Sequence, residues 1–97
     1  TCALPISRIE PIRDAVSDKT ELIVDGGIRR GTDILKALAL GANAVSFARP
    51  YLYGLAAGGE AGAIRAVELI RDALIRDMIL LGTQSVSAID KSFVRLK

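Results

Sequence analysis

The chain has 97 residues, 51% of them hydrophobic, which fits one domain or part of a larger one. Its formal net charge is only +2, with 13 basic and 11 acidic residues interspersed, so we expect neither nucleic acid nor an anionic membrane as a partner. Histidine is absent, which excludes histidine metal ligands and a histidine general base. The single cysteine, Cys2, excludes a disulfide framework and favours a reducing compartment such as the cytoplasm.

The first six residues are predicted to be foreign to the protein. Residues 1–6 back-translate as ACG TGT GCT CTT CCG ATC, and with the first T of a Ser7 codon this reproduces a common sequencing adapter. Back-translation is degenerate, so an ordinary short loop or strand end is the alternative. On the adapter hypothesis the chain is a truncated reading frame, and only residues 7–97 belong to the protein.

The N-terminal third predicts a short helix followed by a strand. The helix begins at Pro11, where the missing N–H costs nothing, and Ile12, Ala15 and Val16 form its apolar stripe. After a polar turn, residues 22–24 are continuously apolar and partly β-branched, which predicts a strand buried on both faces, as in parallel sheets.

A glycine-rich turn, residues 25–31, follows this strand with the sequence D-G-G-I-R-R-G. Glycine lets the main chain adopt conformations closed to other residues and approach a ligand closely. A helix that begins just beyond adds free N–H groups and the positive end of its dipole, and two arginines add permanent charge. These features predict a loop that binds a phosphate group. The alternative is that the turn only connects two elements, as such turns often do. Arg30 is expected at a solvated surface position.

The rest of the chain predicts helix, strand and helices. A helix over residues 33–40 has Thr32 as its N-cap and ends at Gly41, and a short buried strand follows over residues 44–48. One or two helical turns over 51–57 end at Gly58-Gly59, and a long helix over 60–81 ends at Gly82, with an apolar stripe of Ile64, Val67, Ile70, Leu74, Met78 and Leu81. Ser85 is expected to cap a final short helix before a tail over 91–97.

This order is α-β-α-β-α, and the helix between two buried strands is typical of a parallel sheet in an α/β protein. Two strands do not form a stable parallel sheet alone. The pattern therefore predicts the last two βα units of a (βα)8 TIM barrel, which normally needs about 250 residues. A doubly wound sheet is the alternative, but the turn lacks the G-x-G-x-x-G spacing. The mean hydropathy of +0.36 agrees with a surface that another part of a protein covers.

The carboxyl ends of the two strands are expected to form one phosphate site. In a barrel they share a face, and adjacent strands lie about 4.8 Å apart. Amides of the glycine turn and amides near residues 48–49 are the predicted donors, and Arg49 and Arg29 the predicted charges. Asp25 is expected to accept hydrogen bonds from sugar-type hydroxyls or to orient an arginine, because a phosphate would repel it.

Two segments resemble a known family. V-D-G-G-I-R-R-G-T-D-I-L-K-A-L-A-L-G-A-N-A-V (24–45) and A-R-P-Y-L-Y-G-L-A-A-G-G-E-A-G (48–62) resemble the C-terminal part of the FMN-dependent α-hydroxy acid dehydrogenases. IMP dehydrogenase and the FMN-dependent isopentenyl diphosphate isomerase contain similar D-G-G-I turns and are the alternatives. The second segment favours the hydroxy acid family.

This resemblance implies a (βα)8 flavoprotein with FMN as its cofactor. The family's first FMN phosphate segment falls on Asp25, Gly26, Gly27, Ile28 and Arg29. Its second segment, normally Gly-Arg, falls on Ala48 and Arg49. Ala48 is a departure, because its methyl group could crowd the phosphate or demand a less glycine-like main chain.

The resemblance also implies which function the chain lacks. The family's catalytic base is a histidine in an S-N-H-G-G-R-Q-L-type motif, which the chain does not contain. We therefore expect no catalytic residue here, only an FMN phosphate site for a parent that oxidises an L-2-hydroxy acid to a 2-oxo acid. Expected partners of the parent are the small 2-hydroxy acid and further copies in a homo-oligomer, with no metal. A non-catalytic half-barrel that self-associates is a further alternative.

Overall fold

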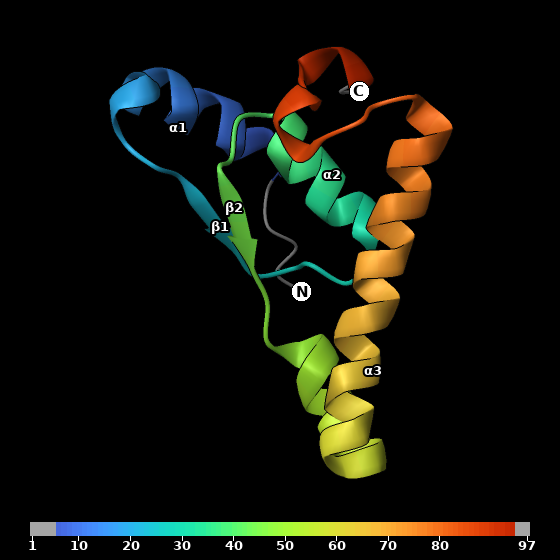
Figure 1. Cartoon of the computed structure of the whole chain (residues 1–97). Helices are drawn as coiled ribbons and strands as arrows, with labels where there is room; N and C mark the ends of the chain where they lie inside the picture. Colours follow the sequence, from blue (N-terminus) through green and yellow to red (C-terminus); the bar gives the residue numbers. More distant parts are fainter. Residues whose placement is uncertain (1–5, 95–97) are drawn as a thin grey trace.

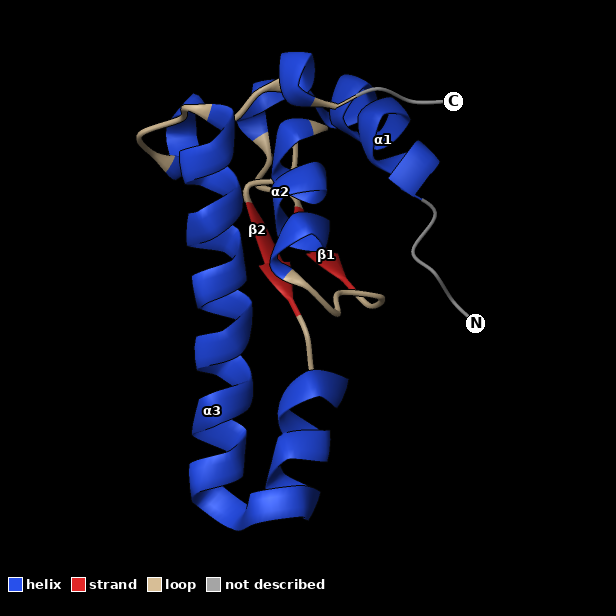
Figure 2. Cartoon of the chain, turned by 90° about the vertical axis from the view of Figure 1, so that its right-hand side faces the viewer, coloured by secondary structure: helices blue, strands red, loops and turns tan. Residues whose placement is uncertain are grey.

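The computed structural model describes residues 6–94 of the chain (Figures 1 and 2). Residues 1–5 of the predicted foreign lead and residues 95–97 of the predicted tail lie outside this range. The elements in chain order are η1 (Ile6–Arg8), α1 (Ile9–Val16), η2 (Ser17–Lys19), β1 (Ile23–Asp25), α2 (Gly31–Ala39), β2 (Ala44–Ser46), α3 (Arg49–Leu81), η3 (Val86–Ala88) and η4 (Lys91–Phe93), where η denotes a 3-10 turn.

The two strands form a parallel sheet, and α2 connects them and covers one of its faces (Figure 2). Val24 points into the core that α2 completes and is 6% exposed, whereas its neighbour Ile23 is 61% exposed. The prediction that the first strand is buried on both faces is therefore wrong for this chain. The described residues provide a helical layer for one face of the sheet, and the other face is open to solvent.

The C-terminal end of α2 is fixed by Gly41, as predicted. Gly41 has a φ of +118°, and its amide donates to Leu38 O at 3.2 Å while the next amide, that of Ala42, donates to Ala37 O at 3.1 Å. This is the Schellman pattern of a helix that ends in a left-handed glycine. Arg13 of α1 donates from Nε to Gly41 O at 2.8 Å, which ties α1 to this end of the sheet.

Helix α3 is a helical hairpin, as the two predicted helices separated by Gly58-Gly59 imply. Gly59 has a φ of +64°, and the chain reverses there so that the short arm, 49–57, lies against the long arm, 60–81 (Figure 1). The arms touch at Gly54 and Gly62, where a Cβ on Gly62 would lie 2.0 Å from Gly54 O. Only glycine at both positions permits this approach.

The long arm of α3 packs on α2, again at a glycine. A Cβ on Gly31 would lie 2.2 Å from Leu74 N, so the main chains of the two helices are in contact. Ile70 is buried beside this contact, whereas Ile64 and Val67 are 52% and 45% exposed. The predicted apolar stripe of the long arm is therefore covered only in part.

The C-terminal segment returns to the body of the molecule. The predicted tail is wrong for residues 91–93, which form η4, and Asp90 caps this turn by accepting from Ser92 N at 2.9 Å. Ile89 is buried against α2, and Lys91 forms an ion pair with Glu10 of α1. The packing of this segment follows from contacts distant in sequence.

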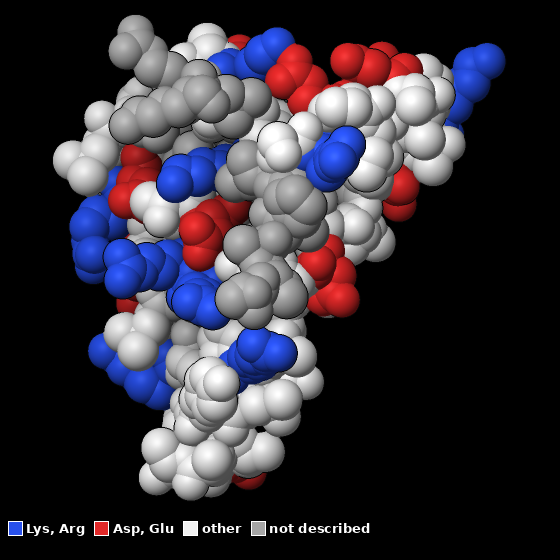
Figure 3. Space-filling model, turned by 180° about the vertical axis from the view of Figure 1, so that it is seen from behind, with Lys and Arg blue, Asp and Glu red and all other residues white. Residues whose placement is uncertain are grey.

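Three small clusters of side chains form the core. The clusters are Ile9, Val24, Ala37, Leu40 and Ala42; Ile28, Ile34 and Ile70; and Leu35, Ala39 and Ile89. Charged side chains of both signs are mixed over the body of the molecule, and the projecting end formed by the α3 hairpin is mostly uncharged (Figure 3). Within residues 6–94, no helix is both long and apolar enough to cross a membrane.

Candidate functional site

A pocket of about 320 Å³ lies where the two strands end. It contains all seven residues that the sequence predicted for the cofactor site, together with Phe47 and Pro50. Its lining residues are Asp25, Gly26, Gly27, Ile28, Arg29, Phe47, Ala48, Arg49 and Pro50. Parallel pairing of β1 and β2 places the two segments side by side, with Asp25 opposite Ser46.

The glycine turn takes a conformation that only glycine adopts readily. Gly26 and Gly27 have φ values of +96° and +75°, in the left-handed region. A Cβ on Gly26 would meet no atom within 4 Å, so glycine is needed there for its main-chain conformation rather than for space. The turn can therefore present consecutive main-chain groups to a ligand.

Ile28 anchors this turn to the core. The residue is 4% exposed and packs with Ile34 and Ile70, so its side chain belongs to the core although the residue lines the pocket. The sequence placed Ile28 in the site without indicating this division. The buried side chain holds the adjacent amides in place against the first turn of α2.

Several main-chain amides around the pocket are available to a ligand. Among the residues that the structure describes, no acceptor takes a hydrogen bond from the amides of Gly27, Ile28 or Arg49. Arg49 begins α3, so its amide belongs to the positive end of that helix, while Pro50 contributes no N–H. Amides of this kind are ready-made donors for an anion.

The charged groups of the pocket favour an anion as well. Arg29 and Arg49 are both exposed, and the structure pairs neither with a carboxylate within residues 6–94. Asp25 is the one acid in the lining, and it forms no ion pair with these arginines within the described chain. The expectation that Asp25 orients an arginine thus has no support in the geometry, and its oxygens are open to hydroxyl donors.

Ala48 occupies a main-chain position that does not require glycine. It has φ −129° and ψ −47° as the N-cap of α3, which is outside the left-handed region. An alanine adopts this φ without the penalty that a left-handed residue would incur. The departure from the family's glycine therefore affects only the space next to a ligand, because the methyl group lies at the pocket.

Sequence reasoning missed two residues of the pocket. Phe47 was assigned to the interior of a strand over 44–48, but β2 ends at Ser46, and Phe47 packs beside the Ile28 cluster as a wall of the pocket. Pro50 was not assigned to the site. Phe47 and Pro50 directly flank Ala48-Arg49 in the sequence, and this position could have indicated that they line the pocket.

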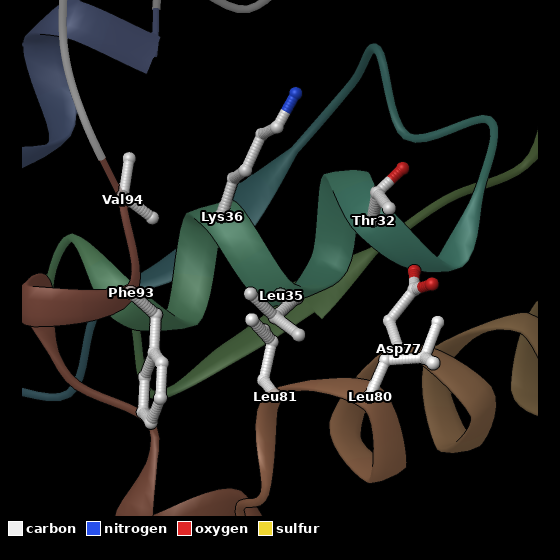
Figure 4. A pocket seen from close by; sticks show the side chains of 8 residues that line it. All are labelled: Thr32, Leu35, Lys36, Asp77, Leu80, Leu81, Phe93 and Val94. Carbon is white, nitrogen blue, oxygen red and sulfur yellow. The ribbon is translucent and has the colours of Figure 1, made fainter.

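A second pocket, of about 330 Å³, lies between α2, α3 and η4 (Figure 4). It contains none of the predicted site residues. Its lining residues are Thr32, Leu35, Lys36, Asp77, Leu80, Leu81, Phe93 and Val94. The lining is mainly apolar, with Thr32, Lys36 and Asp77 as its polar members, so it differs in chemistry from the cationic pocket at the strand ends.

The fold and the first pocket define a class of protein. The chain is a parallel βαβ unit of an α/β protein, and the pocket at the carboxyl ends of its strands has donors suited to an anion. The chain belongs to the FMN-dependent dehydrogenase family, whose sequence model matches residues 1–96. FMN is the cofactor of this family. Within residues 6–94, the amides without an acceptor, the left-handed glycines and the two arginines without a carboxylate partner are compatible with an anionic group such as a phosphate.

Relatives in this family act on hydroxy acids according to their names. L-lactate oxidase from Nostoc is 51% identical over 82 residues, which are 84% of this chain and 22% of the relative. Human 2-hydroxyacid oxidase 1 is 47% identical over 90 residues, which are 93% of this chain and 24% of the relative. The chain thus spans about a quarter of these relatives, and they do not favour the IMP dehydrogenase or isomerase alternatives.

Solved structures of the family contain the same arrangement. The flavin-binding domain of baker's yeast flavocytochrome b2 superimposes with a TM-score of 0.79 at 42% identity, over 90% of this chain and 23% of that one. The (S)-mandelate dehydrogenase of Pseudomonas putida gives a TM-score of 0.87 at 32% identity, over 96% of this chain and 26% of that one. The fold described above is therefore a part of a larger family fold.

Proposed function

We propose that this chain is the C-terminal portion of a (βα)8-barrel enzyme and supplies the FMN phosphate site for oxidation of an L-2-hydroxy acid to a 2-oxo acid. The observation that supports this most directly is the pocket in which the glycine turn after β1 meets Ala48-Arg49 after β2. A phosphate site formed by the last two βα loops and an extra short helix recurs in barrels. In this proposal the short arm of α3, 49–57, is that helix.

Each residue of the pocket has a role in this proposal. The amides of Gly27, Ile28 and Arg49 donate to phosphate oxygens, and Gly26 provides the left-handed turn. Arg29 and Arg49 add charge-assisted hydrogen bonds, which are about twice as strong as neutral ones. Asp25 accepts from hydroxyl groups of the ribityl chain, since repulsion disfavours its contact with the phosphate.

The catalytic groups belong to the rest of the parent. FMN supplies the redox chemistry when bound, and this chain's residues hold and orient it. Because the chain has no histidine, the isolated protein should oxidise neither lactate, glycolate nor mandelate. The proposed parent acts on a small 2-hydroxy acid as a homo-oligomer in the cytoplasm.

The test compares FMN with riboflavin, which lacks the phosphate. In one experiment the purified chain is titrated with each flavin. In a second experiment, residues 8–96 replace the matching segment of Nostoc L-lactate oxidase, and this protein is titrated in the same way. Arg49→Met should weaken FMN binding about tenfold, the equivalent of one lost charged hydrogen bond, and leave riboflavin binding unchanged. Arg76→Met, on the exposed face of α3, is the matched control.

Two outcomes would contradict the proposal. One is a replacement protein that folds but binds FMN no better than riboflavin. The other is an Arg49→Met variant with unchanged preference for FMN. A chain that binds no FMN but sediments as a discrete oligomer would instead support the self-associating half-barrel, whose exposed Ile23 face would be its contact surface.

A further inference from the structure

Asp33 connects the first turn of α2 to the glycine-rich loop. Its Oδ2 accepts hydrogen bonds from the amide of Arg29 at 2.9 Å and from the amide of Arg30 at 3.1 Å. The second contact is half of a capping box, because Arg30 is the N-cap and Asp33 the third residue of α2. The first contact goes one residue further back, into the predicted phosphate segment.

These two hydrogen bonds determine which amides remain for a ligand. They use the amides of Arg29 and Arg30, while those of Gly27 and Ile28 have no acceptor among the described residues. The loop is therefore fixed from Ile28 onward: the buried Ile28 side chain holds it to the core, and the Asp33 carboxylate holds the next two amides. The pair of left-handed glycines comes directly before this fixed part, and glycine has several conformations open to it.

Asp33 acts on the pocket without lining it. Its carboxylate is absent from the residues that surround the pocket, and it is partly buried against the helix start. A negative charge at a helix N-terminus is favourable, and two amide donors neutralise it locally. The carboxylate thus affects the conformation of the loop beside the pocket, while its oxygen accepts hydrogen bonds from main-chain amides and does not line the pocket.

We propose that Asp33 is the positioning residue of the FMN phosphate site: it orders the loop so that the amides of Gly27 and Ile28 converge on the phosphate. This inference rests on the proposed function for its ligand. Its structural half, the ordering of the loop, stands on the two hydrogen bonds alone. Without the carboxylate, the helix start persists but the loop samples other conformations, and binding the phosphate must then select one of them.

The experiment uses Asp33→Ala and Asp33→Asn, with Asp72→Ala on the exposed face of α3 as the matched control. FMN and riboflavin affinities are measured by fluorescence for the chain and for the lactate oxidase that contains it. Asp33→Ala should weaken FMN binding about tenfold and leave riboflavin binding unchanged, since two hydrogen bonds to a charged group are lost only at the phosphate loop. Asp33→Asn, which retains an acceptor oxygen, should restore part of the loss.

Hydrogen exchange separates failure of this inference from failure of the proposed function. In the unaltered chain the amides of Arg29 and Arg30 should be protected, and Asp33→Ala should abolish that protection while the amides of α3 stay unchanged. If this occurs and no flavin binds, the phosphate assignment fails and the loop-ordering role stands. Equal loss of FMN and riboflavin affinity, or unaltered exchange at both amides, would overturn the role of Asp33.

Discussion

Replacement of Gly31 by alanine tests how closely α2 and α3 depend on each other. The added Cβ would lie 2.2 Å from Leu74 N, 2.6 Å from Ala73 C and 2.7 Å from Leu74 Cα. All three are main-chain atoms of a helix, so no side-chain rotation relieves the overlap. Since ordinary contacts between heavy atoms are about 3.5–4.0 Å, α3 must retreat by more than about 1 Å.

That displacement separates Ile70 from the cluster that also anchors Ile28. Overpacking of this kind costs about 1–3 kcal/mol, while alanine gains up to about 1 kcal/mol over glycine in a helix. We therefore expect Gly31→Ala to lower the free energy of unfolding by about 2 kcal/mol despite its better helix propensity. In a chain of this size the midpoint of thermal unfolding should fall by about 10 °C.

Urea and thermal unfolding followed by circular dichroism measure the effect. The matched control is Gly58→Ala, where a Cβ meets nothing within 4 Å and φ is −144°. It should change stability by less than about 0.5 kcal/mol. A Gly31→Ala chain as stable as both the unaltered chain and the Gly58→Ala chain would refute the inferred contact between the two main chains.

Three further predictions concern contacts that stabilise the fold. Arg13→Met should cost about 1–3 kcal/mol in urea unfolding, because it removes the bond to Gly41 O that ties α1 to the sheet, whereas Arg76→Met should have no effect. Ile28→Ala should cost about 2–5 kcal/mol, since its side chain is buried, and flavin titration of the same variant should show weaker FMN binding. The Ser92 hydroxyl and amide hold the pKa of Asp90 below its usual value, so this carboxylate stabilises the fold above its unfolded pKa of about 3.9 and stops doing so as the pH falls through the lower folded value. Asp90→Asn should remove that part of the acid dependence when melting is measured against pH.

Glycines marked the ends of elements correctly because their requirement is local. Gly41, Gly59 and Gly82 all have positive φ in the structure, which is the property that favours glycine at a helix end or reversal. A residue type that follows from its own main-chain angle can be recognised without knowledge of its neighbours in space. The hairpin at Gly58-Gly59 is the clearest result of that rule.

The start of α2 was predicted two residues late for an equally physical reason. Thr32 has the chemistry of an N-cap, but the helix begins at Gly31 and the structure gives the capping role to Asp33, which accepts from amides before the helix. A side chain that reaches back three or four residues can replace a conventional cap. Sequence alone does not distinguish the two solutions.

Burial was predicted least well, because it depends on which elements pack together in space and not on the composition of a segment alone. A strand such as β1 has the composition of one enclosed by helices and neighbouring strands, yet Ile23 is exposed in the described chain. In the apolar stripe of α3, Ile64 and Val67 are likewise exposed. Conversely, residues 91–93 gave no periodic signal, and only contacts with α1 and α2 make them a part of the fold.

The meeting of the two loops at one pocket was more predictable than the geometry of that pocket. Because adjacent parallel strands end on one face, the two loops had to meet, and the structure places all seven predicted residues around one pocket. What the sequence could not supply is orientation. It did not indicate that the Ile28 side chain points into the core, nor that Asp33 fixes the loop.

The main-chain conformation of Ala48 has a consequence for how this family can diverge. At Gly27 the left-handed angle makes almost every substitution costly, so that position is constrained by the fold even without a ligand. At Ala48 the φ of −129° lies outside the left-handed region, so the main chain makes no such demand for glycine there. Of the two loops that line the pocket, the glycine turn is therefore the one whose sequence is constrained by its main-chain conformation alone.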